Sequence, residues 1–98
     1  MNMQAMLKQA QKLQSDMMKA QEKINETIFE GKSSIVTVKM NGKKELVEVK
    51  ISADEIDKDD VELLQDMVMI AVNDAIKQIN DVTEQELGAY TKGMPGLF

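Results

Sequence analysis

The chain lacks cysteine, histidine, tryptophan and arginine altogether among its 98 residues. Without cysteine and histidine it offers no disulfide, thiolate nucleophile, imidazole base or usual zinc ligand. Its longest apolar run, Met67–Val72, is far shorter than the roughly 20 residues that a membrane span needs. Residues Met1–Leu13 alternate methionine with glutamine and lysine, unlike a signal peptide. We therefore expect a cytoplasmic protein that is not an enzyme and uses no cofactor, metal, membrane or small-molecule substrate.

Acidic residues are frequent just after the midpoint of the chain, at Asp54, Glu55, Asp57, Asp59, Asp60 and Glu62. A calcium-binding EF-hand loop needs a glycine at its sixth position and acids at fixed offsets, and this segment has neither. Acids also stabilise the positive end of a helix dipole, so we predict a structural role for them.

Charge is unevenly distributed along the chain, whose net charge is −5. Residues 1–30 are balanced, Gly31–Ile51 carries a net +3, and Ser52–Phe98 carries a net −8. All twelve cationic residues are lysines, whereas arginine is the usual bidentate reader of guanine and phosphate. Any nucleic-acid contact is therefore expected to reach the phosphate backbone rather than read sequence.

The N-terminal segment has a heptad pattern, in which Met3, Ala10, Met17 and Ile24 recur every seven residues and Met6, Leu13, Ala20 and Thr27 follow them. This pattern predicts an amphipathic helix over about residues 3–25. Its methionines are most simply packing residues. Its lysines lie within roughly 60° of arc, nearly opposite the apolar stripe.

The middle of the chain alternates as a β-hairpin does, with Val36, Val38 and Met40 matched by Val47, Val49 and Ile51. Asn41-Gly42 favours a type I′ turn. A two-residue loop pairs Val36 with Val47, and a four-residue loop pairs Val38 with Val47. Both place the valines on one face, while a three-residue loop would split them. Thr27–Glu30 is a third candidate strand, before a turn at Gly31–Ser34.

A second long helix is predicted over about residues 60–86, capped by Ser52-Ala53-Asp54-Glu55, Asp57 or Asp59. Between Leu63 and Ile76 it is apolar enough to be covered on two sides. Asn73 and Asp74 stand within it, and we interpret them as a helix-end or interface hydrogen-bond pair. We expect one domain over residues 1–87 and a flexible, glycine-rich tail over residues 88–98.

Four strings resemble the YbaB/EbfC family of bacterial nucleoid-associated proteins: MLKQAQKLQ (Met6–Gln14), VTVKMNGKKELVEVKI (Val36–Ile51), AVNDAIKQI (Ala71–Ile79) and GMPGLF (Gly93–Phe98). The resemblance covers nearly the whole chain. It implies an α+β fold of helix, three-stranded antiparallel sheet and helix, forming a tweezer-like homodimer with long protruding helices. It also implies binding to double-stranded DNA with little sequence preference at the bacterial nucleoid. One departure is Gly31-Lys32-Ser33-Ser34, where family members usually have more glycine.

The candidate DNA-binding residues are two groups of lysines, Lys8, Lys12, Lys19 and Lys23 on the first helix and Lys39, Lys43, Lys44 and Lys50 on the hairpin. The helix lysines equally fit a solvated face that pairs locally with Asp16, Glu22 and Glu26. The hairpin lysines equally fit protection of an edge strand. The alternative function is a protein–protein adaptor or small chaperone that acts through the heptad helix.

Overall fold

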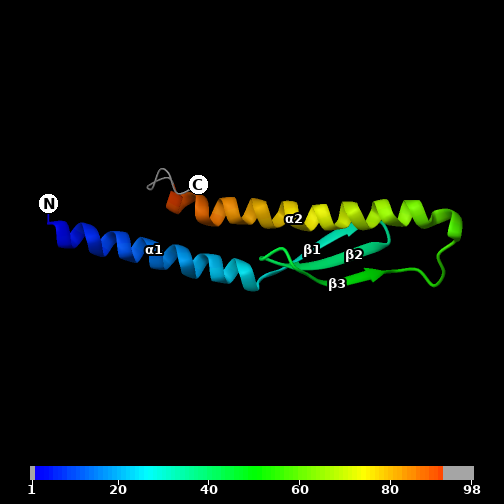
Figure 1. The fold of residues 1–98 in the computed structure, drawn as a ribbon, viewed down its shortest axis with the longest axis horizontal. Coiled ribbons are helices and arrows are strands. Elements are labelled where there is room, and N and C mark those ends of the chain that lie inside the picture. The colour runs from blue at the N-terminus through cyan, green and yellow to red at the C-terminus, as the bar shows by residue number, and fades with distance from the viewer. Residues whose placement is uncertain (1, 92–98) are drawn as a thin grey trace.

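The structure is a computed structural model that describes residues 2–91. Helix α1 (Met3–Glu26) leads into strands β1 (Ile28–Ser33), β2 (Val36–Asn41) and β3 (Leu46–Ile51), and a 3₁₀ turn, η1 (Lys58–Asp60), precedes helix α2 (Val61–Thr91). The strands form one antiparallel sheet in the order β1-β2-β3. Helix α2 runs antiparallel to α1, so the start of α1 and the end of α2 lie toward the same end of the molecule (Figure 1). The expected α+β order of elements is confirmed.

The molecule is strongly elongated. It measures 70 × 20 × 14 Å and its radius of gyration is 19.4 Å, whereas a compact domain of this length would have a radius of gyration of about 13 Å. The length comes from the helices, since α1 has 24 residues and α2 has 31. The first half of α1 extends past the end of α2 (Figure 1).

The main core lies between α2 and one face of the sheet. Helix α2 contacts β1 and β2 but not β3. Val36, Val38 and Met40 of β2 point into this core, where Ala71 and Ala75 of α2 are fully buried. The small alanines let the helix lie close to the strands. We call this the inner face of the sheet, and its opposite the outer face.

The two helices pack on each other only over part of α1. Ile24 and Leu87 are buried there, and Met17, Ala20, Val82 and Tyr90 are half-buried beside them. The heptad stripe therefore does become a packing face, but only in its second half. Met3, Met6, Leu7 and Ala10 remain exposed.

The hairpin has the three-residue loop that we expected to split the valines. Asn41 accepts a backbone hydrogen bond from Lys44, and Asn41 donates one to Glu45. Lys44, not Asn41, takes a left-handed φ of 65°, so a type I′ turn at Asn41-Gly42 was the wrong prediction. The Asn41 side chain stabilises this turn, because its Oδ1 accepts from the backbone N–H groups of Lys43 and Glu45.

A β-bulge returns Val49 to the face that carries Val36 and Val38. Met40 pairs with Leu46, but Lys39 pairs with Glu48 and Val38 with Val49, which leaves Val47 as an extra residue. Both predicted registers were therefore wrong, although Val38 and Val49 do share the inner face. A three-residue loop alone shifts the register by one residue and would exchange the two faces of β3. The bulge adds a second one-residue shift, which reverses this exchange.

Two boundaries differ from the prediction. Strand β1 continues to Ser33, and Ser34 turns the chain with a φ of 52°. Helix α2 begins after Asp57 caps η1, and it continues through Gly88 to Thr91. A glycine costs a helix only about 1 kcal/mol, and packing of Leu87 and Tyr90 on α1 offsets it. Residues 88–91 are therefore helical, and residues 92–98 of the expected tail lie outside the described residues.

Candidate nucleic-acid interface

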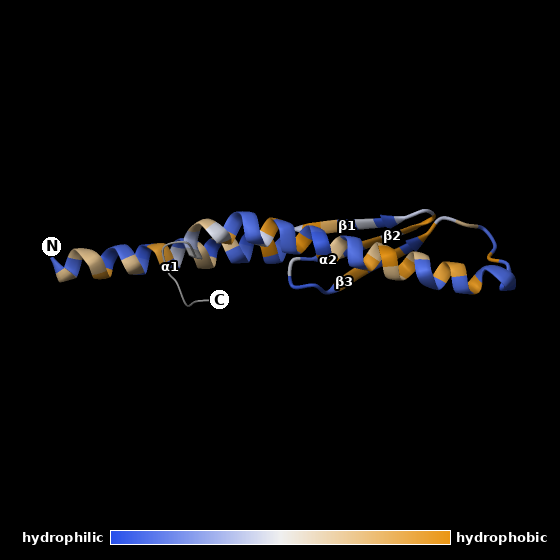
Figure 2. Cartoon of the chain, turned by 90° about the horizontal axis from the view of Figure 1, so that it is seen from above, coloured by the Kyte–Doolittle hydropathy of each residue, from blue (hydrophilic) through white to orange (hydrophobic). Residues whose placement is uncertain are grey.

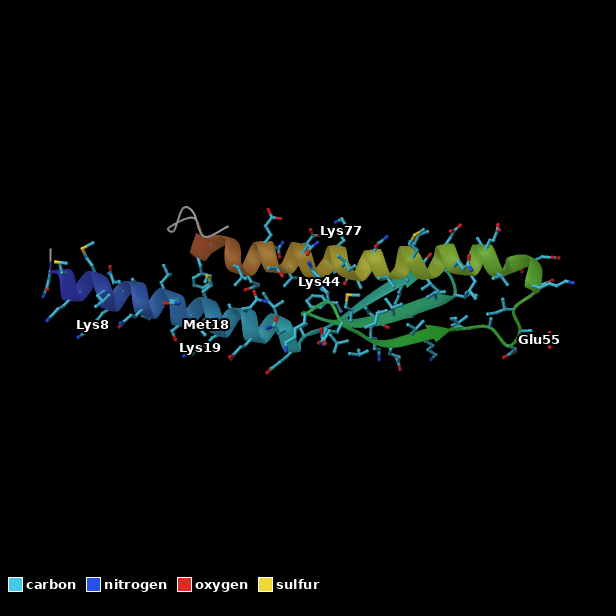
Figure 3. The ribbon with its side chains drawn as sticks, in the orientation of Figure 1. Lys8, Met18, Lys19, Lys44, Glu55 and Lys77 are labelled. Atoms are coloured by element: carbon cyan, nitrogen blue, oxygen red, sulfur yellow. The ribbon has the colours of Figure 1, made fainter. Side chains whose placement is uncertain are left out.

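The four lysines of α1 form a row along the side of the helix that does not pack. Lys8, Lys12, Lys19 and Lys23 are all exposed, and Lys8 and Lys19 point away from α2 (Figure 3). We call these four residues the lysine row. Their position follows from the heptad pattern, since Met17, Ala20 and Ile24 turn the opposite side of the helix toward the core.

The lysine row carries unpaired charge. Within residues 2–91 the ion pairs are Lys39–Glu48 at 3.5 Å and Lys77–Asp81 at 2.9 Å. Neither involves α1, so the local pairing with Asp16, Glu22 and Glu26 that we considered is not formed in the described part of the chain. Unlike the lysines of the row, Lys77 on α2 has an acidic partner, and its hydrogen bond to Asp81 raises the pKa of Lys77.

The hairpin lysines do not form one continuous surface. Lys39 and Lys50 are on the outer face of the sheet, and Lys39 pairs across the strands with both Glu30 and Glu48. Lys43 and Lys44 lie in the turn beyond the sheet. The negative charges of Glu30 and Glu48 beside Lys39 weaken its attraction for a phosphate group.

A further lysine, Lys32, lies on the outer face in the same cross-strand row as Thr37 and Lys50. It was not among the predicted residues, because β1 was expected to end at Glu30. Side chains alternate between the two faces of a strand. Because Phe29 is buried on the inner face and β1 continues to Ser33, Lys32 falls on the outer face.

The turn of the hairpin is fixed against the end of α1. Gly42 donates a backbone hydrogen bond to the carbonyl of Asn25 at 3.3 Å. A Cβ at Gly42 would collide with the carbonyl of Ile24. This contact attaches the base of the protruding helix to the sheet, so the lysine row has a rigid support at one end.

The polar residues inside α2 serve the sheet. Asp74 accepts a hydrogen bond from the backbone N–H of Lys32 at 3.0 Å, and Gln78 donates one to the carbonyl of Glu30 at 2.8 Å. Of the predicted pair, Asp74 makes its hydrogen bond at the interface between α2 and the sheet, Asn73 is exposed, and neither residue lies at a helix end. Both bonds occupy the outward edge of β1, which therefore cannot accept another strand there.

The opposite edge of the sheet is open and apolar. Val49 belongs to the inner face, yet it is 48% exposed because α2 does not reach β3. Val68 and Val72 lie on roughly the opposite side of α2 from Asp74, and thus toward β3, half-buried against the core. Together with Val49 and Ile51 they form what we call the open apolar face. Figure 2 shows hydrophobic colour on the strands and on the first half of α2.

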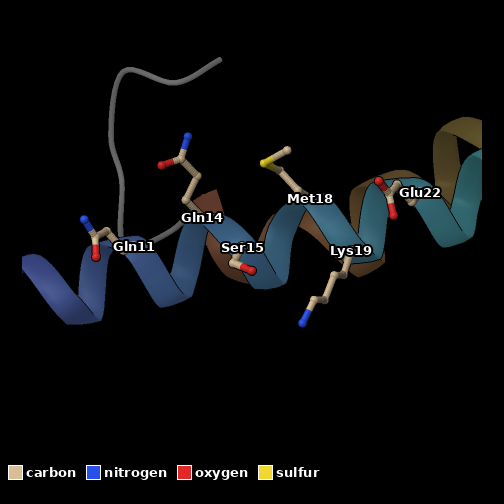
Figure 4. Close-up of a pocket in the computed structure, with 6 residues that line it drawn as sticks. All are labelled: Gln11, Gln14, Ser15, Met18, Lys19 and Glu22. Atoms are coloured by element: carbon tan, nitrogen blue, oxygen red, sulfur yellow. The ribbon is translucent and has the colours of Figure 1, made fainter.

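The described part of the chain contains neither a cluster of metal ligands nor a membrane-spanning helix. No group of three acids among residues 2–91 could hold a metal ion, and no helix there is long and apolar enough to cross a membrane. A shallow depression on α1 is lined only by residues of that helix (Figure 4): Gln11, Gln14, Ser15, Met18, Lys19 and Glu22. A surface on one helix cannot enclose a substrate.

Comparison with known proteins gives a consistent result. A family model described as the YbaB/EbfC DNA-binding family matches residues 1–94. A nucleoid-associated protein of Lactococcus lactis subsp. cremoris is 56% identical over 97 residues, covering 97% of this chain and 98% of its own. One of Enterococcus faecalis is 48% identical, covering 98% and 94%. The crystal structure of an uncharacterized protein, HP0035 from Helicobacter pylori, superposes with a TM-score of 0.67 at 25% identity, covering 94% and 97%.

Proposed function

Because the chain belongs to the YbaB/EbfC DNA-binding family, we propose that it binds double-stranded DNA as a homodimer, with little sequence preference, through lysine–phosphate contacts. In this role it organises the nucleoid and modulates gene expression. Its relatives in Lactococcus lactis and Enterococcus faecalis carry the name nucleoid-associated protein. The family match carries the class of function, and the residues below support the particular mode.

The lysine row is the observation that carries this mode of binding. It places four exposed, unpaired ammonium groups on one side of a helix in a protein that is acidic overall. Repulsion from the remaining acids is short-ranged, because the Debye length is about 8–10 Å at physiological salt. A locally positive surface can therefore bind a polyanion despite the net charge.

Lysine chemistry supports contact with the backbone rather than with bases. An ammonium group is a point charge on a flexible stem, and it lacks the planar fork that arginine presents to guanine. Contacts to phosphate fix position and supply affinity but read no sequence. The chain has no arginine, so weak sequence preference is the expected result.

The open apolar face supports a homodimer. It joins half-exposed Val49 to the flank of α2, and monomeric proteins rarely leave a continuous apolar surface of this kind. The edge of β1 is closed by Asp74 and Gln78, whereas no residue in 2–91 occupies the edge of β3. A second copy related by a two-fold axis would cover the same residues on both chains.

The test of DNA binding is a gel-shift titration at two salt concentrations. The change is Lys8→Gln, Lys12→Gln and Lys19→Gln together. We expect weaker binding to all duplexes alike, and a salt slope lowered by about 2.7 per chain, since each lost phosphate contact removes about 0.9.

The matched control replaces three hairpin lysines, Lys43, Lys44 and Lys50, with glutamine. It removes the same charge but leaves the lysine row intact. If the helix variant binds as the parent does while the hairpin variant fails, the hairpin is the interface and the lysine row is not.

An adaptor or chaperone function is a second candidate, favoured by the exposed first half of the heptad stripe. Met3 is 84% and Leu7 60% exposed, and methionine surfaces adapt to varied partners. The same titration separates the two functions. A parent chain that fails to shift duplex DNA even at low salt would contradict the DNA-binding proposal and favour the adaptor.

A further inference from the structure

Helix α1 contains an internal repeat that accounts for all four lysines of the row. Met6–Gln14 reads MLKQAQKLQ, and Met17–Asn25 reads MMKAQEKIN. The two nine-residue units start eleven residues apart. Each has methionine first, lysine at its third and seventh positions, and Leu13 or Ile24 at its eighth. The lysines therefore come as two modules, Lys8 with Lys12 and Lys19 with Lys23.

An eleven-residue repeat keeps the two modules on one side of a helix. Eleven residues are close to three turns, so the second module is rotated by only about 20° and displaced by about 16 Å along the axis. Lys8 and Lys19, the equivalent members of the two modules, point to the same side of α1 (Figure 3). The helix thus presents two lysine pairs of equal spacing with a gap between them, and the second pair also holds Glu22 where the first unit has Gln11.

The gap argues against contact with one continuous phosphate strand. Ser15 and Asp16 occupy it, and Asp16 lies on the wheel within about 60° of the lysines beside it. A strand of phosphates running below the whole helix would meet this carboxylate. The arrangement instead suits two separate rows of phosphates, one at each lysine module, with no phosphate facing Asp16 between them.

The spacing matches the two walls of a DNA groove. The major groove of B-DNA is about 12 Å wide, which with the radii of the phosphates puts the phosphorus atoms of its walls roughly 18 Å apart. Along the axis the inner lysines, Lys12 and Lys19, are about 10 Å apart, and the outer ones about 22 Å. Each wall would therefore lie between the two lysines of one module. The minor groove is only about 6 Å wide, and its walls would lie near the inner lysines alone.

We infer that α1 lies across the mouth of the major groove of duplex DNA, with one lysine module on each phosphate wall. This inference rests on the proposed function, and it names the geometry by which that function is carried out. The helix cannot be inserted lengthwise into the groove. Lysines confined to about 60° of arc face one way, whereas an inserted helix needs cations on both flanks.

The test moves one charge without changing the total. The variant Lys8→Gln with Ser15→Lys keeps four lysines on the exposed side of α1, but places one of them above the groove. We expect it to bind duplex DNA like Lys8→Gln alone, more weakly than the parent by roughly tenfold at 0.1 M salt for each chain that contacts the DNA, because each chain loses one phosphate contact. Affinity equal to the parent would overturn the inference, since it would mean that only total charge matters.

Lys77→Gln is the control for charge removed elsewhere, because Lys77 is exposed on α2 and paired with Asp81. It is expected to bind as the parent does. Circular dichroism of every variant must show the helical content of the parent.

Groove-specific competitors give a second readout on the unmodified protein. Methyl green occupies the major groove and netropsin the minor groove. We expect methyl green to displace the protein and netropsin to leave it bound, and the reverse result would overturn the inference. A parent that binds no DNA would instead contradict the proposed function, so the two failures are distinguishable.

Discussion

Helix α2 approaches the sheet closely at a residue without a side chain. Gly31 of β1 is buried against Ala71 and Ala75 of α2, and an added Cβ would collide with the carbonyl of Ala71. Three small residues thus set the distance between helix and strand. At Gly88 the situation is the reverse, since a Cβ there would meet nothing within 4 Å.

Replacing Gly31 with alanine is expected to destabilise the protein by about 1–3 kcal/mol, the usual cost of overpacking a close contact. Urea unfolding at fixed protein concentration measures it. An unchanged midpoint would show that α2 can move away from β1 at little cost.

Gly88→Ala is expected to stabilise the protein, by about 0.5–1 kcal/mol, because alanine restricts the unfolded chain and favours the helix. The same urea experiment gives the comparison. A loss of stability would indicate that residue 88 needs the freedom of glycine.

At the scale of elements, helix α2 both covers the sheet and closes one of its edges. Asp74 and Gln78 occupy outward backbone groups of β1, and no residue of the described chain does this for β3. The two edges of a three-stranded sheet are therefore unequal, and only the edge at β3 is available for pairing with another chain.

Asp74→Ala is expected to cost about 1–2 kcal/mol, because it leaves the Lys32 N–H without its acceptor. It should also raise the tendency to aggregate, since it opens the edge of β1. Thermal unfolding and light scattering measure the two effects. Asn73→Ala, at an exposed neighbouring position, is the control, and equal behaviour of both variants would contradict the edge-closing role.

Sequence patterns predicted the elements better than their details. The heptads of α1 and the alternation of β2 were sufficient because both are set by burial of one face. The bulge at Val47 could not be predicted, since it depends on the Asn41 side chain stabilising a three-residue loop. The partner of Asp74 lies 42 residues away in sequence, and no local pattern indicates such a contact. The lysine row was predicted as a surface, and its role in DNA binding remains a prediction.

At the scale of the whole molecule, the long axis exceeds what one short sheet can cover. The 70 Å length leaves apolar surfaces without cover in the described chain, among them the open apolar face, the first half of the heptad stripe, and Leu63, Met69 and Ile70 of α2. A dimer through the open apolar face would join two sheets at the centre. The lysine rows would then project outward on paired helices.

Val49→Lys is expected to weaken the dimer, because it places a charge in the middle of the open apolar face. Sedimentation equilibrium measures the shift toward monomer, with Lys50→Glu on the outer face of the same strand as control. Should the variant fail to fold, dilution of the parent gives the same information. A folded parent monomer at micromolar concentration would contradict the dimer.

The bulge in β3 gives the hairpin an unequal tolerance to deletions. Val47 is an extra residue between Leu46 and Glu48, so a chain that lacks it would join the same partners in a regular ladder and keep Val49 and Ile51 on the inner face. Strand β2 has no such spare residue, and removal of Thr37 would turn Val36 or Val38 toward solvent. Shortening by one residue is therefore nearly neutral in one strand and disruptive in its neighbour.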